Sequence, residues 1–179
     1  MLTGQKVILT SIERYDLPKN YLWGNNRELI RLSGISPFPK SSWQIEKWYE
    51  QSLTNPATML LAIRNKAAEY IGNIELSNID FKNSRAEIGI LIGEKDFQNK
   101  GYGSDALKTI IEFGFKELNL NRLYARVLSF NQAGIKLFKD ADFVEEGRER
   151  EAFYSEGKYW DILLFSKLRN DKKARTARH

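Results

Sequence analysis

The chain contains no cysteine, and its single histidine is the last residue, His179. The absence of cysteine excludes disulfides, thiolate metal ligands and an acyl-cysteine intermediate. The lack of an internal histidine excludes a Ser-His-Asp triad and a histidine-based zinc site. We therefore expect no metal, and any acyl transfer by this chain would need direct attack by the acceptor on a bound thioester.

Long apolar runs are also missing. No run approaches the ~20 residues that cross a bilayer, and the first six residues lack a signal-peptide core. We therefore expect a cytoplasmic protein with no membrane partner. The net charge is +5, and basic residues crowd the end of the chain. We interpret residues 169–179 as a solvated, disordered tail, and a nucleic-acid contact through this tail is the alternative.

The rest of the chain is typical of one globular domain, which we place at residues 1–168. Its 179 residues are 42% apolar and 28% charged, enough to bury a core. Alternation and helical periodicity predict a mixed α/β fold without internal repeats. The expected strands are 6–10, 59–64, 70–76, 85–92, 122–128, 143–150 and 159–167. The expected helices are 16–32 (with a pause at 23–26), 41–53, 102–118 and 133–139. We expect Asp16 to cap the first of them, and Ser41 with Gln44 predicts a capping box at the start of the second.

The most informative segment joins the strand at 85–92 to the helix that starts near residue 102. It reads Gln98, Asn99, Lys100, Gly101, Tyr102, Gly103 and Ser104. Glycines at a helix start let backbone N–H groups and the helix dipole bind a phosphate or pyrophosphate. A nucleoside-triphosphatase loop is excluded because no Gly-Lys-Ser/Thr follows Gly101. A dinucleotide loop fits poorly because eight residues separate strand and glycine, and a structural helix-entry turn stays open.

The segment also has the form Q/R-x-x-G-x-G/A, with Gln98, Gly101 and Gly103 at the fixed positions. In this it resembles the pyrophosphate loop of the Gcn5-related N-acetyltransferases (GNAT). Residues 86–92 and 125–131 look like the fourth and fifth strands of that family. Residues 143–147 and 157–161 are similar to the C-terminal hairpin of its ribosomal-protein and spermidine acetyltransferase branch. The resemblance covers roughly residues 2–168.

The resemblance implies a single GNAT domain with a mostly antiparallel sheet of about six to seven strands and acetyl-CoA as cofactor. The fourth and fifth strands would splay apart and hold the pantetheine arm between them. Main-chain groups of Leu91, Ile92 and Gly93 would pair with the arm, and Asn131 would bond it through its side chain. A helix N-cap is an alternative role for Asn131, and the two roles are compatible. The resemblance leaves a homodimer open as an assembly.

Carboxylates supply candidate bases for such a reaction. A free alkylamine has a pKa of about 10.4, and a positioned carboxylate can take its proton before attack, directly or through water. Alternation places Glu87 on the strand face opposite Ile88 and Ile90, and Glu75 takes the equivalent face of the neighbouring strand. We predict that Glu87 is the base, with Glu151 next in line. A merely solvated glutamate is the alternative for each.

The acceptor site would lie between a helical insert and the hairpin. By resemblance, Trp23 and Phe38 would wall it, and Glu75 and Glu149 would attract a cationic amine such as a small-molecule amine or a protein N-terminus. In the resembled family, the positions of Phe138 and Gly134 usually hold side chains that can donate a proton to the departing thiolate. A phenyl ring and a glycine cannot donate, so Tyr154 is our candidate acid. The expected activity is acetyl transfer to a primary amine. A non-catalytic acyl-CoA-binding protein on the same fold is the alternative.

Overall fold

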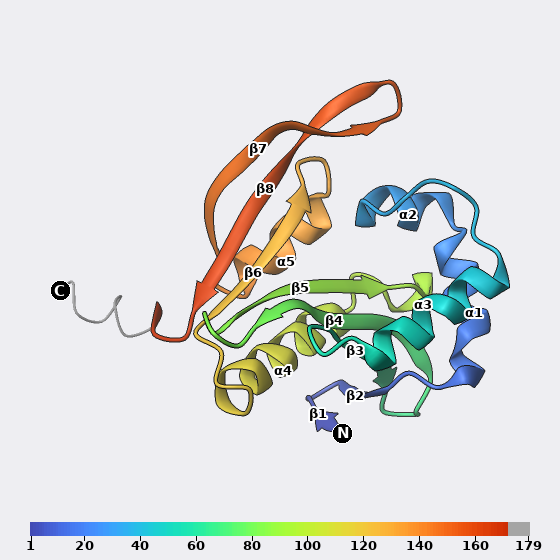
Figure 1. Cartoon of the computed structure of the whole chain (residues 1–179), viewed down its shortest axis with the longest axis horizontal. Helices are drawn as coiled ribbons and strands as arrows, with labels where there is room; N and C mark the ends of the chain where they lie inside the picture. The colour runs from blue at the N-terminus through green and yellow to red at the C-terminus, as the bar shows by residue number, and fades with distance from the viewer. Residues whose placement is uncertain (172–179) are drawn as a thin grey trace.

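One mixed sheet runs through the computed structural model, which describes residues 1–171 (Figure 1). Its eight strands lie in the order β1-β2-β3-β4-β5-β6-β8-β7, and every neighbouring pair is antiparallel except β5 and β6. The strands are β1 (Leu2–Thr3), β2 (Val7–Ser11), β3 (Met59–Asn65), β4 (Tyr70–Asp80), β5 (Arg85–Ile92), β6 (Arg122–Leu128), β7 (Val144–Ser155) and β8 (Lys158–Leu168).

Helices cover both faces of this sheet. They are α1 (Leu17–Gly24), α2 (Arg27–Ser33), α3 (Ser42–Thr54), α4 (Tyr102–Lys116) and α5 (Gln132–Asp140), with short 3-10 turns at Arg14–Asp16 and Lys95–Phe97. The larger core packs α4 and α5 against one face and includes Ile88, Ile110 and Phe165. A smaller cluster packs the α1–α3 side against the other face and includes Trp23, Tyr49 and Ala62. The single α/β domain predicted from sequence is confirmed.

The strand count is one higher than expected because β1 is too short to produce a pattern. It adds to the edge of the sheet by pairing Leu2 with Leu9 of β2. Other local predictions are confirmed. The first helix stops at Gly24 and α2 resumes at Arg27, and Ser41 and Gln44 form a capping box at the start of α3.

The expected splay is present between β5 and β6. The two strands pair in parallel from Arg85↔Arg122 to Glu87↔Tyr124, and their register ends there. Beyond it β5 stays paired with β4 as far as Ile92, and β6 stays paired with β8 as far as Leu128. The sheet therefore opens into a wedge between these two strands, and Figure 1 shows them diverging.

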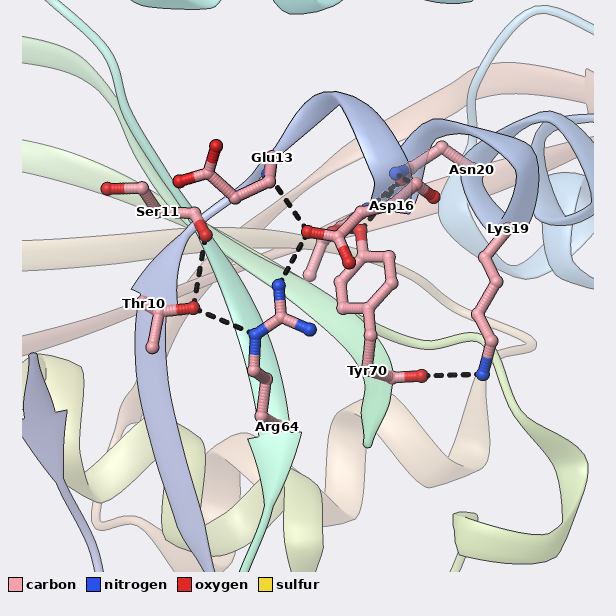
Figure 2. A network of polar contacts seen from close by, with 9 residues as sticks. Thr10, Ser11, Glu13, Asp16, Lys19, Asn20, Arg64 and Tyr70 are labelled. Carbon is pink, nitrogen blue, oxygen red and sulfur yellow. Dashed lines mark hydrogen bonds and ion pairs between the residues drawn. The ribbon is translucent and has the colours of Figure 1, made fainter. Parts of the chain in front are cut away.

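A buried polar network fixes α1 on the sheet (Figure 2). Asp16 is 3% exposed and its carboxylate accepts from Arg64 Nη2 at 2.6 Å. We expected Asp16 to cap the helix, and it does occupy the N-cap position of α1. Its side chain instead accepts from the Glu13 amide at 2.9 Å, so it closes the 3-10 turn before the helix. Because Arg64 also donates to Thr10 Oγ1, the network joins β2, β3 and α1.

Within residues 1–171, no helix is both long and apolar enough to span a membrane. Arg169, which we expected to begin the tail, donates to the Leu120 carbonyl and the Asn119 side chain. The predicted boundary between the domain and the tail at residue 168 stays a prediction. Tail residues 172–179 lie outside the described residues.

Candidate active site

The glycine-containing loop lies at the open end of the wedge and turns the chain into α4. Asn99 and Gly101 both have left-handed backbone conformations, with φ of 56° and 86°. The first helical hydrogen bond runs from the Asp105 amide to the Gly101 carbonyl at 3.1 Å. The amides of Tyr102, Gly103 and Ser104 therefore have no partner within the helix, and they form the positive end of its dipole.

Charged side chains around the loop favour an anion. The Asp105 carboxylate at the helix start would repel a phosphate. It accepts hydrogen bonds from the backbone amides of Gln5, Lys6 and Val7, however, and these donors offset its negative charge. Lys6 Nζ donates to the Lys100 carbonyl at 2.8 Å, so its ammonium lies beside the loop. Lys100 itself is exposed. Sequence reasoning missed Lys6 because it precedes the loop by more than ninety residues and belongs to no local motif.

The β5 side of the wedge offers backbone groups in an alternating pattern. The Gly93 amide donates to the Ile71 carbonyl at 3.0 Å, so it faces β4. Alternation then directs the backbone groups of Leu91 toward β4 as well, and those of Ile90 and Ile92 toward the wedge. Gln98 Nε2 already donates to the Ile92 carbonyl at 2.9 Å. Of the three residues predicted to pair with a cofactor arm, Ile92 is thus the one whose amide faces the opening.

Gly103 shapes the wedge on the α4 side. A Cβ atom built on it would lie 3.7 Å from Ile92 Cγ1 and 4.0 Å from Leu137 Cδ1. A larger side chain would therefore extend into the space between β5 and α5. We call this space the cradle, and its use by a pyrophosphate stays a prediction.

Both the oxygen and the nitrogen of the Asn131 side-chain amide form hydrogen bonds within the protein. Its Oδ1 accepts from the Gly134 amide at 2.9 Å, which caps α5. Its Nδ2 donates to the Leu32 carbonyl at 3.0 Å, in the last turn of α2. The helix-cap role is therefore confirmed, and Asn131 also ties α2 to the end of β6.

The face of the sheet opposite α4 carries two carboxylates near the wedge. Glu75 pairs with Gly89 across β4 and β5, and its Oε1 would lie 2.9 Å from a Cβ at that glycine. Among residues 1–171 the Glu75 carboxylate forms no hydrogen bond or ion pair. Burial, with a smaller contribution from the charge of Glu87, raises its pKa. Glu87 accepts from Asn78 Nδ2 at 3.0 Å.

Other residues predicted for the acceptor side have varied surroundings. Trp23 is 5% exposed, with its ring against Gly93 and 4.8 Å from the ring of Tyr70, so it belongs to the core of this region. Phe38 is 76% exposed in the loop before α3. Glu149 forms an ion pair with Arg126 at 2.5 Å.

The remaining two candidates lie on the β7–β8 hairpin. Glu151 has a φ of 51° at an irregularity in the β7 register, and its amide donates to Asp161 Oδ1 at 2.9 Å. Tyr154 is 61% exposed, with its ring 5.0 Å from that of Tyr159. Phe138 is 4% exposed and packs against Phe143 and Phe165, so the residue in the usual donor position belongs to the core.

Three comparisons with known proteins agree with this geometry. A family model described as an acetyltransferase (GNAT) domain matches residues 6–144. An uncharacterised N-acetyltransferase of Bacillus licheniformis is 31% identical over 173 residues, which cover 95% of this chain and 97% of the relative.

Two solved structures of spermidine N-acetyltransferase from Vibrio cholerae are also similar. One, in complex with CoA and spermine, has a TM-score of 0.87 and 26% identity, covering 93% of this chain and 98% of that one. The other, a dodecamer in an intermediate state, has a TM-score of 0.81 and 26% identity, covering 97% and 99%.

Proposed function

The chain belongs to the GNAT acetyltransferase family, and from that premise we propose that it moves an acetyl group from acetyl-CoA directly to a primary amine. The observation that carries the proposal is the wedge between β5 and β6, which opens beside the glycine loop after Glu87↔Tyr124. A strand gap with backbone donors on one side and free helix amides at its mouth suits an extended arm that ends in a pyrophosphate.

Residues of the loop and the wedge would hold the cofactor. The amides of Tyr102, Gly103 and Ser104 and the ammonium of Lys6 would face its phosphates, and the Ile92 amide would pair with its arm. Asn131 would orient the site by holding α2 in place. When bound, acetyl-CoA supplies an acetyl group activated as a thioester.

Glu75 is our choice for the group that takes the proton from the amine. A base works best when its pKa lies near the working pH, and burial moves the pKa of Glu75 in that direction. Its carboxylate has no partner to displace among the described residues. Glu87, which the sequence favoured, is held by Asn78 and adds negative charge that raises the affinity of Glu75 for a proton. Both carboxylates would also attract the ammonium form of the acceptor.

The proton for the departing thiolate has no donor at the positions the family resemblance suggested. Phe138 has no hydroxyl and lies in the core, and Gly134 has no side chain. We propose that water supplies this proton, with Tyr154 of the hairpin as the protein group to test.

The acceptor we propose is a primary amine with cationic character. The similar Vibrio cholerae structure holds CoA and spermine, and its name assigns it spermidine as substrate. A protein N-terminus stays a second acceptor to test. Because one similar structure is dodecameric, we propose self-association for this chain as well, and a homodimer is the smallest such assembly.

Thiol release from acetyl-CoA over a panel of primary amines tests the proposal, with calorimetry of acetyl-CoA binding beside it. The wild-type chain should bind acetyl-CoA and release thiol only when an amine is present. Gly103→Trp should abolish binding because its side chain would fill the cradle. Gly147→Trp is the matched control, since a Cβ at Gly147 would have no atom of residues 1–171 within 4 Å. Binding without turnover on any amine would contradict the proposal.

A further inference from the structure

The turn between β1 and β2 is bound to the first turn of α4. It comprises residues 4–6, which we call the N-terminal turn, and the Gly4 amide closes it by donating to the Val7 carbonyl at 2.9 Å. The Asp105 carboxylate of α4 accepts from three successive amides of this segment, at 3.1, 2.7 and 3.0 Å. Successive backbone amides that converge in this way bind anions, and here the anion belongs to the chain itself.

Gly4 lies so close to Asp105 that a side chain there would collide with the carboxylate. A Cβ atom built on Gly4 would lie 2.4 Å from Asp105 Oδ2 and 2.6 Å from Thr109 Oγ1. Lys66, in the loop between β3 and β4, donates from its Nζ to the Gly4 carbonyl at 2.8 Å. The N-terminal turn is therefore held both by α4 and by the β3–β4 loop.

The position of the N-terminal turn determines where the Lys6 ammonium lies. The backbone amide of Lys6 is one of the three donors to Asp105, and its Nζ donates to the Lys100 carbonyl at 2.8 Å. Lys6 also lines an open hollow of about 210 Å³ together with Gly101 and Ser104 of the glycine-containing loop. The bonds to Asp105 thus fix the backbone of Lys6 while its side chain reaches the loop.

We propose that Asp105 is a positioning residue for the cofactor pyrophosphate: its carboxylate holds the N-terminal turn, and the turn holds the Lys6 ammonium beside the loop. The inference rests on the proposed function and deepens it at the cofactor site. Its expected effect has the opposite sign to that of charge alone. A carboxylate at a helix start repels phosphates, so charge alone predicts that removing it strengthens their binding. A positioning role predicts weaker binding.

Calorimetry of CoA binding to the full chain tests this sign. Asp105→Asn should raise the Kd for CoA about tenfold, the size of one lost hydrogen bond to a charged group. The reason is that one oxygen and an NH2 group replace the two acceptor oxygens that hold the turn. Gly4→Ala keeps every charge but sets a methyl group against the carboxylate, and it should raise the Kd in the same direction. Gly147→Ala is the matched control and should keep the wild-type Kd, since a Cβ there meets no atom of residues 1–171 within 4 Å.

The salt dependence of the Kd separates positioning of Lys6 from a general loss of stability. Lys6→Met should raise the Kd and make it less sensitive to ionic strength, because one ammonium fewer faces the phosphates. Asp105→Asn should show the same reduced sensitivity, and combining the two substitutions should weaken binding no further than either alone. A less stable fold would lower the Tm without changing the salt dependence. Should Asp105→Asn not fold, Gly4→Ala takes its place in the same comparison.

Tighter CoA binding by Asp105→Asn would overturn the inference. Effects of Asp105→Asn and Lys6→Met that add in full in the double variant would overturn it as well, because the two residues would then act independently. Failure of the proposed function gives a different result, namely no thiol release with any amine. The calorimetric comparison stays valid in that case because it uses no acceptor.

Discussion

At the scale of single residues, the chemistry depends on how neighbours tune similar carboxylates. Glu75 and Glu87 lie on adjacent strands and the same sheet face, yet within residues 1–171 Glu87 alone of the two accepts a side-chain hydrogen bond. Burial raises the pKa of Glu75. On the outer surface, by contrast, a hydrogen bond from Lys116 lowers the pKa of Glu112. The same residue type therefore has a raised pKa where it is buried and a lowered pKa where it forms a surface ion pair.

The opposite pKa shifts of Glu75 and Glu112 predict that substituting them has opposite effects on the stability of the fold. Glu75 holds its proton more tightly in the folded chain than in the unfolded chain, so its contribution to stability is lost as pH rises through its folded pKa. Glu75→Gln should therefore raise the Tm at neutral pH, and the gain should shrink toward about pH 4, near the unfolded pKa. Thermal unfolding followed by circular dichroism measures this.

Glu112→Gln provides a control of opposite sign. Its lowered pKa means that its contribution is present above the unfolded pKa and is lost as pH falls, so the substitution should leave the Tm unchanged or slightly lower it at neutral pH. A Tm for Glu75→Gln below that of the wild type at neutral pH would contradict the assignment of an unfavourable buried charge.

At the scale of elements, features that depend on residues close together in the chain could be predicted from the sequence. Contacts between segments far apart in the chain could not. The glycine-containing loop, the capping box at Ser41 and the three-strand meander follow from residues close together in the chain. The burial of Trp23 against Gly93 and the contact of Arg31 with Glu156 join segments far apart, and no periodicity encodes them. The two-residue strand β1 was missed because alternation needs a longer run.

Asn131 links two elements, and its two bonds can be separated by substitution. Asn131→Ala removes the cap of α5 and the bond to Leu32, and should cost about 1–2 kcal/mol of unfolding free energy. Asn131→Asp keeps an oxygen for the Gly134 amide but loses the donor to Leu32. Hydrogen exchange should then show faster exchange in α2 for both variants, and in α5 for Asn131→Ala alone. Unchanged hydrogen exchange in α2 would contradict the inference that the Asn131–Leu32 hydrogen bond holds α2 in place.

At the scale of the whole molecule, the sheet supports two packed sides and one opening. The α4–α5 side holds the larger core, and the α1–α3 side is fixed by the Asp16–Arg64 pair and its neighbours (Figure 2). The opening lies within the sheet, where β5 and β6 separate after three parallel residue pairs. The family pattern predicted this division and the loop at its mouth. The choice between Glu75 and Glu87 required the structure, because it depends on burial and on Asn78.

The central claim is that this opening brings a thioester and an amine together beside Glu75, which takes the proton. The pH dependence of kcat for the wild type, Glu75→Gln and Glu87→Gln tests it most directly. Glu75→Gln should lower kcat about a hundredfold and remove the acidic limb while acetyl-CoA binding is kept. Glu87→Gln should keep most of the rate and move that limb to lower pH, because a neighbouring negative charge is gone. A Glu75→Gln variant with the rate and pH profile of the wild type would contradict the account.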